Sequence, residues 1–319
     1  MSLPLLSVVV CTCNRAELLP RAIDSILSQK TPFNFEIIII DDHSIDNTPN
    51  VVVDYHYRFP SVIRWHRMET NVGVGAAWAT GVKMCRGRYL TFLDDDDRFE
   101  GEERFAKMVA YIEDNADKID LLYTDGVLFD EAKGKEKPIE YPTEDYPNLY
   151  KMWRGEQLCI QLNMMMVKRE VLLRAINLDD YIKYRFPMQD WNTNILLLKE
   201  AKTAFMHLPS VVLYQTKKSL SRSVDYDKII EKQRRESDMC SYLASQFPND
   251  NRISHDKVAA ERYTYHILTA AAYQKGDYHD AKIFAARSEE TTLRVRCTGT
   301  WLTFQMYRFA HFLRAKVRS

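Results

Sequence analysis

The chain has 319 residues, 46% of them hydrophobic, and its 44 basic and 44 acidic side chains cancel to a formal charge of zero. A chain of this length can bury a sizeable core and form one large domain with an appendage. The neutral balance gives no reason to expect nucleic acid or another polyanion as a partner, and sparse Gly and Pro argue against long disordered segments.

The cysteines and the apolar segments bear on the cellular compartment. Six cysteines, at positions 11, 13, 85, 159, 240 and 297, form no CxxC pair and no Cys/His cluster at zinc-ligand spacing. They predict buried thiols in a reducing compartment, the cytoplasm. The N-terminus lacks a basic n-region and no run reaches about 18 apolar residues, so we expect neither a signal peptide nor a transmembrane helix.

The first part of the chain alternates between strands and helices. Apolar strands are predicted within 5–15, 35–48, 62–68 and 88–93, and helices within 16–29, 51–59 and 73–85. This alternation predicts a parallel α/β sheet. Ligands of such sheets bind outside the carboxyl ends of the strands, and those ends carry Asn14, Asp41, Asp42 and Asp94 to Asp97.

The remainder of the chain is less regular. It predicts a helix at 102–115, a strand with an irregular tail at 119–130, a charged loop at 131–148, a strand and helix at 161–176, a helix at 190–201, and strands with a basic loop at 204–223. From about residue 226 only helices are expected, and 265–290 resembles a single tetratricopeptide unit, which must pack on something. We therefore expect a domain at 1–225 and a helical region at 226–319.

The run Asp94 to Asp97 is the most unusual feature. Oxygen ligands spaced by one residue at a strand end can hold Mg²⁺ or Mn²⁺ with positions open for phosphates. The alternative is a cap for the following helix, because Asp favours helix N-caps. A cap accounts for one or two of these acids but not for four.

Two further motifs are weaker. Asp41 and Asp42 could accept hydrogen bonds from a nucleobase or a ribose, or could cap a turn together with Ser44 and Asp46. Gly73 and Gly75 match neither a Walker A motif nor GxGxxG. Small residues at these positions favour close helix packing, with phosphate contact as the second interpretation.

Together the blocks 6–29, 35–48, 71–97 and 189–201 resemble family 2 glycosyltransferases with the GT-A fold, in order and spacing. The resemblance covers roughly residues 5 to 225. It implies a Rossmann-like, mostly parallel central sheet flanked by helices, here with a helical C-terminal extension.

The resemblance also implies roles for individual residues. Asp94 and Asp96 match a DxD motif that binds Mn²⁺ or Mg²⁺, with Asp97 following, and Asp190 matches the catalytic base. The donor, a nucleotide sugar, would be bound by Thr12, Asn14, Arg15, Asp41, Asp42, Asp94, Asp95 and Lys217. The reaction implied is one inverting displacement, in which the metal stabilises the leaving diphosphate and Asp190 deprotonates the acceptor hydroxyl. An N-cap is the alternative role for Asp190.

The chain departs from the family pattern at three places. An arginine common in the family is missing from Ala77 to Thr80, Gln189 stands where Glu is usual, and Lys217 stands where His is frequent. A protonated lysine cannot ligate metal, but it could bind a phosphate. These departures bear on the donor geometry and, to a lesser degree, on the activity that the resemblance implies.

The segment 292–319 combines aromatic and basic residues at helical spacing. Such a helix suits an anionic membrane surface, where lipid-linked saccharide acceptors are found. The alternative is that its apolar face packs on the rest of the protein.

Three functions remain open. The first is sugar transfer from a UDP-sugar or a related donor to a saccharide or lipid-linked hydroxyl, in surface polysaccharide or glycoconjugate synthesis. The second, nucleotidyl or phosphoryl transfer, lacks a glycine-rich triphosphate loop after the first strand. The third is a catalytically impaired nucleotide-sugar binder or scaffold.

Overall fold

The computed structural model describes residues 3–141, 145–153, 157–215 and 226–253, together with residues 279, 282, 283, 285 and 286. The chain divides into two compact units, Met1–Arg222 and Ser223–Ser319. The first unit contains both sheets and the carboxylates singled out in the sequence.

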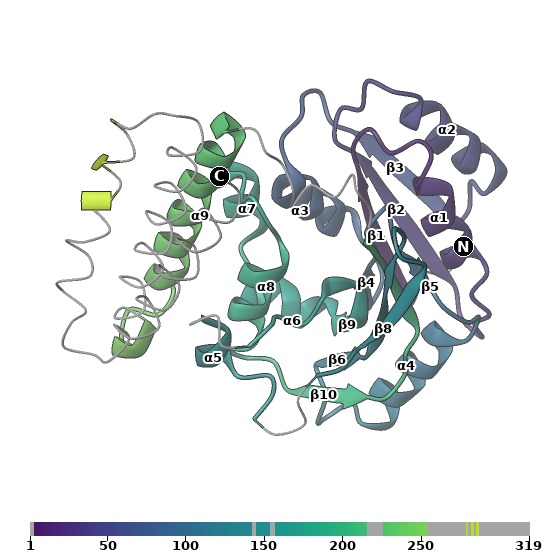
Figure 1. Ribbon diagram of the computed structural model, residues 1–319. Coiled ribbons are helices and arrows are strands. Elements are labelled where there is room, and N and C mark those ends of the chain that lie inside the picture. The colour runs from purple at the N-terminus through teal and green to yellow at the C-terminus, as the bar shows by residue number, and fades with distance from the viewer. Residues whose placement is uncertain are drawn as a thin grey trace. The chain divides into compact units, whose positions relative to one another are not determined.

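A seven-stranded sheet forms the centre of the first unit, in the order β10-β6-β9-β4-β1-β2-β3 (Figure 1). Its strands are β1 (Leu6–Thr12), β2 (Phe35–Asp41), β3 (Ile63–Arg67), β4 (Tyr89–Phe92), β6 (Leu121–Thr124), β9 (Met165–Lys168) and β10 (Thr203–Met206). Neighbouring strands are parallel except that β9 runs antiparallel to both β4 and β6. The prediction of a mostly parallel α/β sheet is confirmed.

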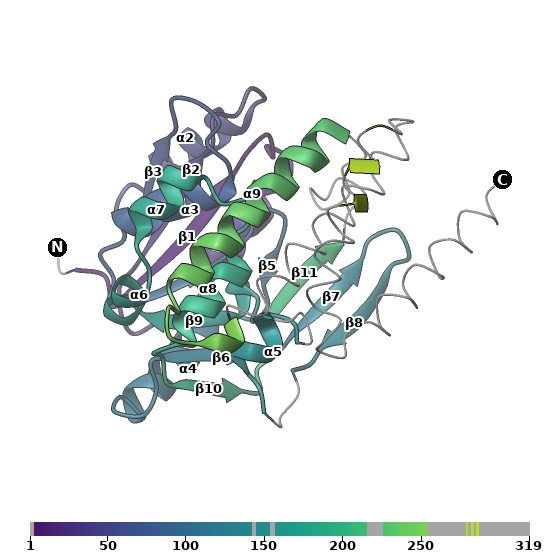
Figure 2. The same cartoon turned by 90° about the vertical axis from the view of Figure 1, so that its left-hand side faces the viewer.

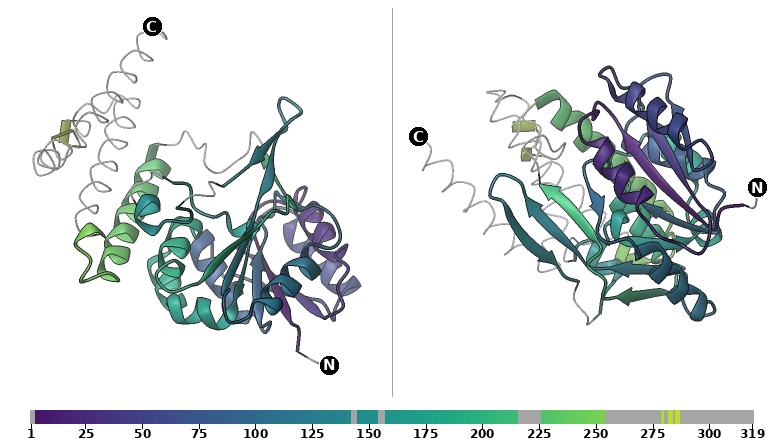
Figure 3. Two further views of the ribbon diagram at one scale, coloured as in Figure 1. Left: turned by 90° about the horizontal axis from the view of Figure 1, so that it is seen from below. Right: turned by 90° about the vertical axis from the view of Figure 1, so that its right-hand side faces the viewer.

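Helices cover both faces of this sheet (Figures 1 and 3). One face carries α1 (Leu19–Leu27), α2 (Thr48–Arg58) and α4 (Arg104–Asp114). The other face carries α3 (Val74–Met84), α6 (Arg169–Ala175), α7 (Leu178–Tyr184) and α8 (Asp190–Leu197). Burial on both sides explains the continuous apolar run of β2, in which residues 37 to 40 are all 0% exposed.

A second sheet has the order β5-β11-β7-β8 and contains β5 (Arg98–Phe99), β7 (Gly126–Asp130), β8 (Lys135–Ile139) and β11 (Val211–Gln215). Figure 2 shows β11, β7 and β8 side by side. The prediction that 131–148 is only loop is wrong, because β8 pairs antiparallel with β7. Its charged residues and Pro138 are tolerated because β8 is an exposed edge strand.

Two short elements complete the first unit, α5 (Leu149–Trp153) and the 3₁₀ turn η1 (Leu162–Met164). The expected single strand at 119–130 divides at Asp125 into β6 and β7, which belong to different sheets.

In the second unit the structure describes the helix α9 (Tyr226–Ser245). The tetratricopeptide-like segment 265–290 lies almost entirely outside the described residues, and the basic segment 292–319 lies wholly outside them. Within the described ranges, no helix is both long enough and apolar enough to cross a membrane.

Helix α3 approaches the segment before α8 closely at Gly75. A Cβ atom added at Gly75 would lie 2.4 Å from the backbone oxygen of Phe186. Real Cβ atoms do not come this near to a carbonyl oxygen, so a side chain here requires the backbone to move.

We expect Gly75→Ala to lower the free energy of unfolding by about 1–3 kcal/mol, the usual cost of overpacking. Urea denaturation checks this. The control is Thr80→Ala on the same helix, where a half-buried hydroxyl bonds the Ala76 carbonyl, and its effect should stay within about 0.5 kcal/mol. If Gly75→Ala instead gained the roughly 1 kcal/mol of alanine's helix propensity, the close approach would be refuted.

Candidate active site at the carboxyl edge of the sheet

The register of three parallel strands brings the predicted residues together. Thr12 at the end of β1 lies opposite Asp41 at the end of β2. Strand β4 pairs with β1 on the side of β1 that faces away from β2. The hydrogen bonds between β4 and β1 continue one residue beyond β4, where the Leu93 N–H donates to the Val9 carbonyl. The acids that follow β4 therefore start beside the last residues of β1.

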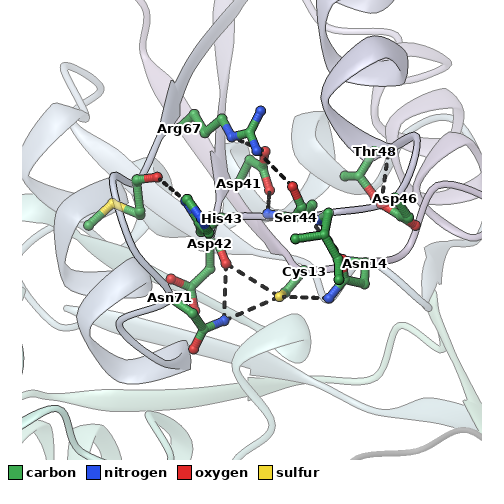
Figure 4. A network of polar contacts seen from close by, with 12 residues as sticks. Cys13, Asn14, Asp41, Asp42, His43, Ser44, Asp46, Thr48, Arg67 and Asn71 are labelled. Carbon is green, nitrogen blue, oxygen red and sulfur yellow. Dashed lines mark hydrogen bonds and ion pairs between the residues drawn. The ribbon is translucent and has the colours of Figure 1, made fainter.

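Asp41 is fully buried at this edge (Figure 4). Its Oδ1 accepts a hydrogen bond from the Ser44 N–H at 2.9 Å, and its Oδ2 lies 3.5 Å from Nε of Arg67. The carboxylate thus fixes the turn after β2, which is the turn role considered from the sequence.

Asp42 joins β2 to the loop that precedes α3. Its two carboxylate oxygens accept hydrogen bonds from the Val72 N–H at 2.7 Å and the Gly73 N–H at 2.9 Å. Burial raises the pKa of Asp42 above its ordinary value, although these two bonds act in the opposite direction. A donor would therefore meet a carboxylate that is already held in place.

The loop after β1 is fixed by the loop after β2 (Figure 4). Asn14 has a left-handed backbone, with φ of 56°, which Asn tolerates better than most residues. Its side-chain oxygen accepts from the Ile45 N–H at 2.8 Å, and the Arg15 N–H donates to the Thr48 hydroxyl at 2.9 Å. Asn14 and Arg15 are thus both fixed at this edge of the sheet.

The four acids after β4 have different partners. Asp94 Oδ2 and Asp97 Oδ2 accept hydrogen bonds from the same Asn163 amide, at 3.2 and 2.6 Å. Asp96 forms an ion pair with Arg15 at 3.3 Å, in which both side chains are at most 20% exposed. Helix α4 starts only at Arg104 with Glu103 as its N-cap, so the interpretation of the run as a helix cap is wrong.

Burial and mutual repulsion raise the pKa values in this run. Burial, and then Asp96, raise the pKa of Asp94, while burial raises the pKa of Asp95 to about 7 although the Thr12 side chain lowers it. The pKa of Asp97 is raised well above its ordinary value by burial and by Asp94. Arg15 acts in the opposite direction on Asp94 and Asp95, so this guanidinium is one positive partner of the acids.

Asp190 approaches the same acids from another element. It is the first residue of α8, and its pKa is raised by burial and then by the charge of Asp94. The N-cap of α8 is Gln189, and no side chain caps this helix, so the interpretation of Asp190 as a cap is wrong. A carboxyl with a raised pKa is a stronger base than one with the ordinary pKa.

An aromatic cluster joins α3, α7 and β4 on this side. The Trp78 ring lies 5.5 Å from Phe92 and 5.4 Å from Tyr181, measured between centroids. The Tyr181 hydroxyl lies 3.1 Å from the Thr193 hydroxyl on α8. Trp78, from the segment that lacks the family's arginine, is 2% exposed and serves as core.

A metal would have to be held by few protein ligands. Among the described residues no group of three or more His, Cys, Asp or Glu side chains is arranged to hold an ion. The donor set of Asp94 and Asp96 still fits Mg²⁺ or Mn²⁺, which usually take one or two carboxylates together with substrate phosphates. Lys217 lies outside the described residues.

Sequence reasoning missed the residues that support the acids. Arg21 on α1 donates to the backbone oxygen of Asp96, and its guanidinium lies 3.5 Å from the centre of the Tyr214 ring. The Tyr214 N–H donates to Asp97 Oδ1 at 2.8 Å, and Asn163 lies in η1. These residues lie far apart in the chain, and no local pattern marks them.

The chain matches the family model "Glycosyl transferase family 2" over residues 7–174. It is 40% identical over 111 residues to an uncharacterized glycosyltransferase of Haemophilus influenzae, a match that covers 35% of each chain. The chain spans only part of the length of its curated relatives: it is 31% identical over 134 residues to an uncharacterized protein of Mycobacterium bovis, a match that covers 42% of this chain and 39% of that protein.

Solved structures share the fold. A crystal structure of S. aureus TarS 1-349 in complex with UDP-GlcNAc aligns with a TM-score of 0.54 at 14% identity, covering 89% of this chain and 91% of that chain. The mannosyltransferase PcManGT from Pyrobaculum calidifontis, in complex with GDP-Man and Mn²⁺, aligns with a TM-score of 0.52 at 18% identity, covering 98% and 87%.

The fold is thus that of the GT-A glycosyltransferases. The family match covers more than half of the chain, and the protein belongs to glycosyl transferase family 2.

The raised pKa of Asp95 predicts how stability depends on pH. The folded state binds this proton more tightly than the unfolded state does, so the metal-free protein loses stability as pH rises from about 4 to about 7. Asp95→Asn removes this penalty. At pH 8 in EDTA we expect the variant to be more stable by on the order of a few kcal/mol, since one pKa unit corresponds to about 1.4 kcal/mol.

Urea denaturation at pH 4 and pH 8 tests this prediction, because the gain should vanish at the lower pH. The control is Asp54→Asn on α2, whose carboxylate is 63% exposed and pairs with Arg58 at the surface. An equal gain for Asp95→Asn at both pH values would contradict the ionisation argument.

Proposed function

We propose that this glycosyltransferase moves a sugar from a nucleoside-diphosphate sugar to a hydroxyl group of a saccharide or lipid-linked acceptor, with inversion at the anomeric carbon. The observation that carries the proposal is that Asp190 lies within electrostatic reach of Asp94: burial raises the pKa of Asp190, and the charge of Asp94 raises it further. A half-buried base on α8 and an acidic run after β4 would therefore share one site, as an acceptor-activating group and a donor-binding group must.

The chemical step follows from the position of Asp190. Its carboxylate takes the proton from the acceptor hydroxyl while that oxygen attacks the anomeric carbon. The bond from this carbon to the diphosphate oxygen breaks on the opposite face, and the diphosphate leaves with the bonding electrons. A single displacement of this kind inverts the anomeric configuration.

The leaving diphosphate carries the charge that must be stabilised. Asp94 and Asp96 would hold a Mn²⁺ or Mg²⁺ ion, which when bound supplies positive charge to the diphosphate. Arg15 lies against Asp96 and offers a second cationic group at the same place. The Mn²⁺ in the PcManGT complex supports this choice of ion.

The nucleotide is proposed to be UDP. TarS, which aligns with the first unit and beyond, was solved with UDP-GlcNAc, whereas PcManGT was solved with GDP-Man, so GDP is the main competitor. Thr12, Asn14, Asp41 and Asp42 lie at the ends of β1 and β2 and would line the nucleoside side of the pocket. Asp95 and Lys217 are proposed as further donor contacts.

The cellular setting is also a proposal. We place the enzyme in the cytoplasm, at the inner face of the membrane if segment 292–319 binds anionic lipid, with a role in surface polysaccharide or glycoconjugate synthesis. We also propose a catalytic domain at 1–225 and a helical region at 226–319, since the acidic run after β4 and Asp190 both belong to the first part.

A catalytically impaired binder or scaffold is the second candidate. One observation favours it: in the segment where family members carry an arginine, this chain has a buried tryptophan, Trp78, that packs in the core. A protein of this kind would bind the nucleotide sugar and turn it over no faster than a variant without the base.

The donor site can be tested by calorimetric titration with UDP, GDP and dTDP, each with and without Mn²⁺. We expect one nucleotide to bind tightly only with the metal. Asp96→Ala should abolish the effect of the metal, whereas the surface control Asp54→Ala should retain it. Binding of none of the three nucleotides by the folded protein would overturn the proposal.

The base can be tested with Asp190→Asn, which preserves shape and removes basicity. We expect transfer to fall by roughly 10²–10⁴-fold, the usual contribution of a positioned base, while UDP and Mn²⁺ still bind. Release of UDP from the donor sugar measures turnover. Equal turnover by the variant and the wild-type enzyme would exclude Asp190 as the base and favour the binder.

A further inference from the structure

Asn163 is a buried amide that contacts two acids of the run at once. It lies in η1 immediately before β9 and is 2% exposed. Its Nδ2 donates to Asp94 Oδ2 at 3.2 Å and to Asp97 Oδ2 at 2.6 Å. An amide nitrogen carries two hydrogens, so both bonds can form together.

The backbone of Asn163 is fixed by a buried arginine. Arg104 is 1% exposed and donates to the Asn163 carbonyl at 3.0 Å. The Arg104 guanidinium also contacts the Thr91 hydroxyl at 3.4 Å, and that hydroxyl donates to the Met165 carbonyl at 2.7 Å. The backbone of Asn163 is therefore held by residues of β4, β9 and α4 together. This gives the side-chain amide the rigid support that an orienting group needs.

The two acids are not equivalent in this arrangement. Both oxygens of Asp97 are engaged, Oδ2 by Asn163 and Oδ1 by the Tyr214 N–H. Asn163 engages one oxygen of Asp94, and within the described ranges no hydrogen bond engages the other, which could therefore serve as a ligand. Asp97 acts as an anchor for the amide, and Asp94 is the acid that the amide orients.

The chemistry of an amide suits a carboxylate that must bind a cation. An arginine or lysine in this place would neutralise part of the negative charge that attracts the metal. An amide fixes the carboxylate by hydrogen bonds and leaves its net charge unchanged. The contrast is Arg15, whose positive charge already pairs with Asp96.

We propose that Asn163 is a positioning residue for the divalent-metal site, which holds the Asp94 carboxylate in the orientation that coordinates the ion. This inference rests on the proposed function, in which Asp94 and Asp96 bind Mn²⁺ or Mg²⁺. Asn163 itself touches neither the metal nor the substrate.

The test is a Mn²⁺ titration of the full chain at saturating UDP, with free Mn²⁺ followed by electron paramagnetic resonance. We expect Asn163→Leu, which matches the amide in size and donates nothing, to raise the Kd for Mn²⁺ by roughly 10–100-fold, the usual effect of losing such a supporting group. The weak UDP binding that remains in EDTA should be the same in the variant and the wild type, which shows that the nucleoside contacts are intact.

The matched control is Asn192→Leu. Asn192 is 0% exposed, and neither its side-chain nitrogen nor its oxygen has a hydrogen-bond partner in the described part of the chain. This variant should bind Mn²⁺ as the wild type does. If Asn163→Leu does not fold, as judged by circular dichroism, Asn163→Ser retains one donor and should show an intermediate loss.

The outcomes separate the inference from the function on which it rests. Absence of Mn²⁺ binding by the wild type with UDP would overturn the proposed metal site itself. Wild-type Mn²⁺ affinity in a folded Asn163 variant would reject the positioning role and leave the proposed function standing. A loss confined to the Asn163 variants supports the inference.

Discussion

Negative charge is concentrated in a largely buried region at the carboxyl edge of the main sheet, and the free energy of ionising it constrains everything around it. Asp94, Asp95, Asp97 and Asp190 all have raised pKa values, in each case mainly through burial. Removing a carboxylate from water is costly unless hydrogen bonds or positive charge compensate. The partners of these acids are therefore as important for the site as the acids themselves.

Those partners divide into two kinds. Arg15 and Arg21 bring positive charge to the run, Arg15 through Asp96 and Arg21 through the pKa of Asp97. Asn163 and the Tyr214 N–H bring neutral donors. Charged partners stabilise the metal-free site but compete with a cation, whereas neutral donors orient ligands without competing. The proposed metal site would combine both kinds of partner.

Trp78 and Asp42, two residues at positions that the family pattern associates with the donor, have structural roles in this fold. Trp78 packs between Phe92 and Tyr181, so the segment without the arginine contributes to the core that joins α3 to β4 and α7. Asp42 holds the loop before α3 through the Val72 and Gly73 amides. Positions associated with ligand contact in a family can thus also determine where the binding elements lie.

The sequence by itself determined the sheet and the edge at which the site lies. Apolar runs that end in polar residues marked β1, β2 and β4, because strands buried on both faces cannot carry polar side chains until they end. The acidic run was marked by its place at a strand end, whereas the roles proposed for Asp94, Asp96 and Asp190 came from the resemblance to a family. The charged strand β8 was missed, because an exposed edge strand has no apolar pattern to detect.

Only the tertiary structure decided which groups support the acids. Asn163 and the Tyr214 N–H donate to the acids, and Arg104 donates to the Asn163 carbonyl. The three residues come from segments distant in the chain, and the direction of their donors depends on the packing of several elements. A local sequence pattern indicates which residues are buried and with what spacing they recur. It does not record which buried amide meets which carboxylate, because that contact is set by strand order and by helix packing across the whole sheet.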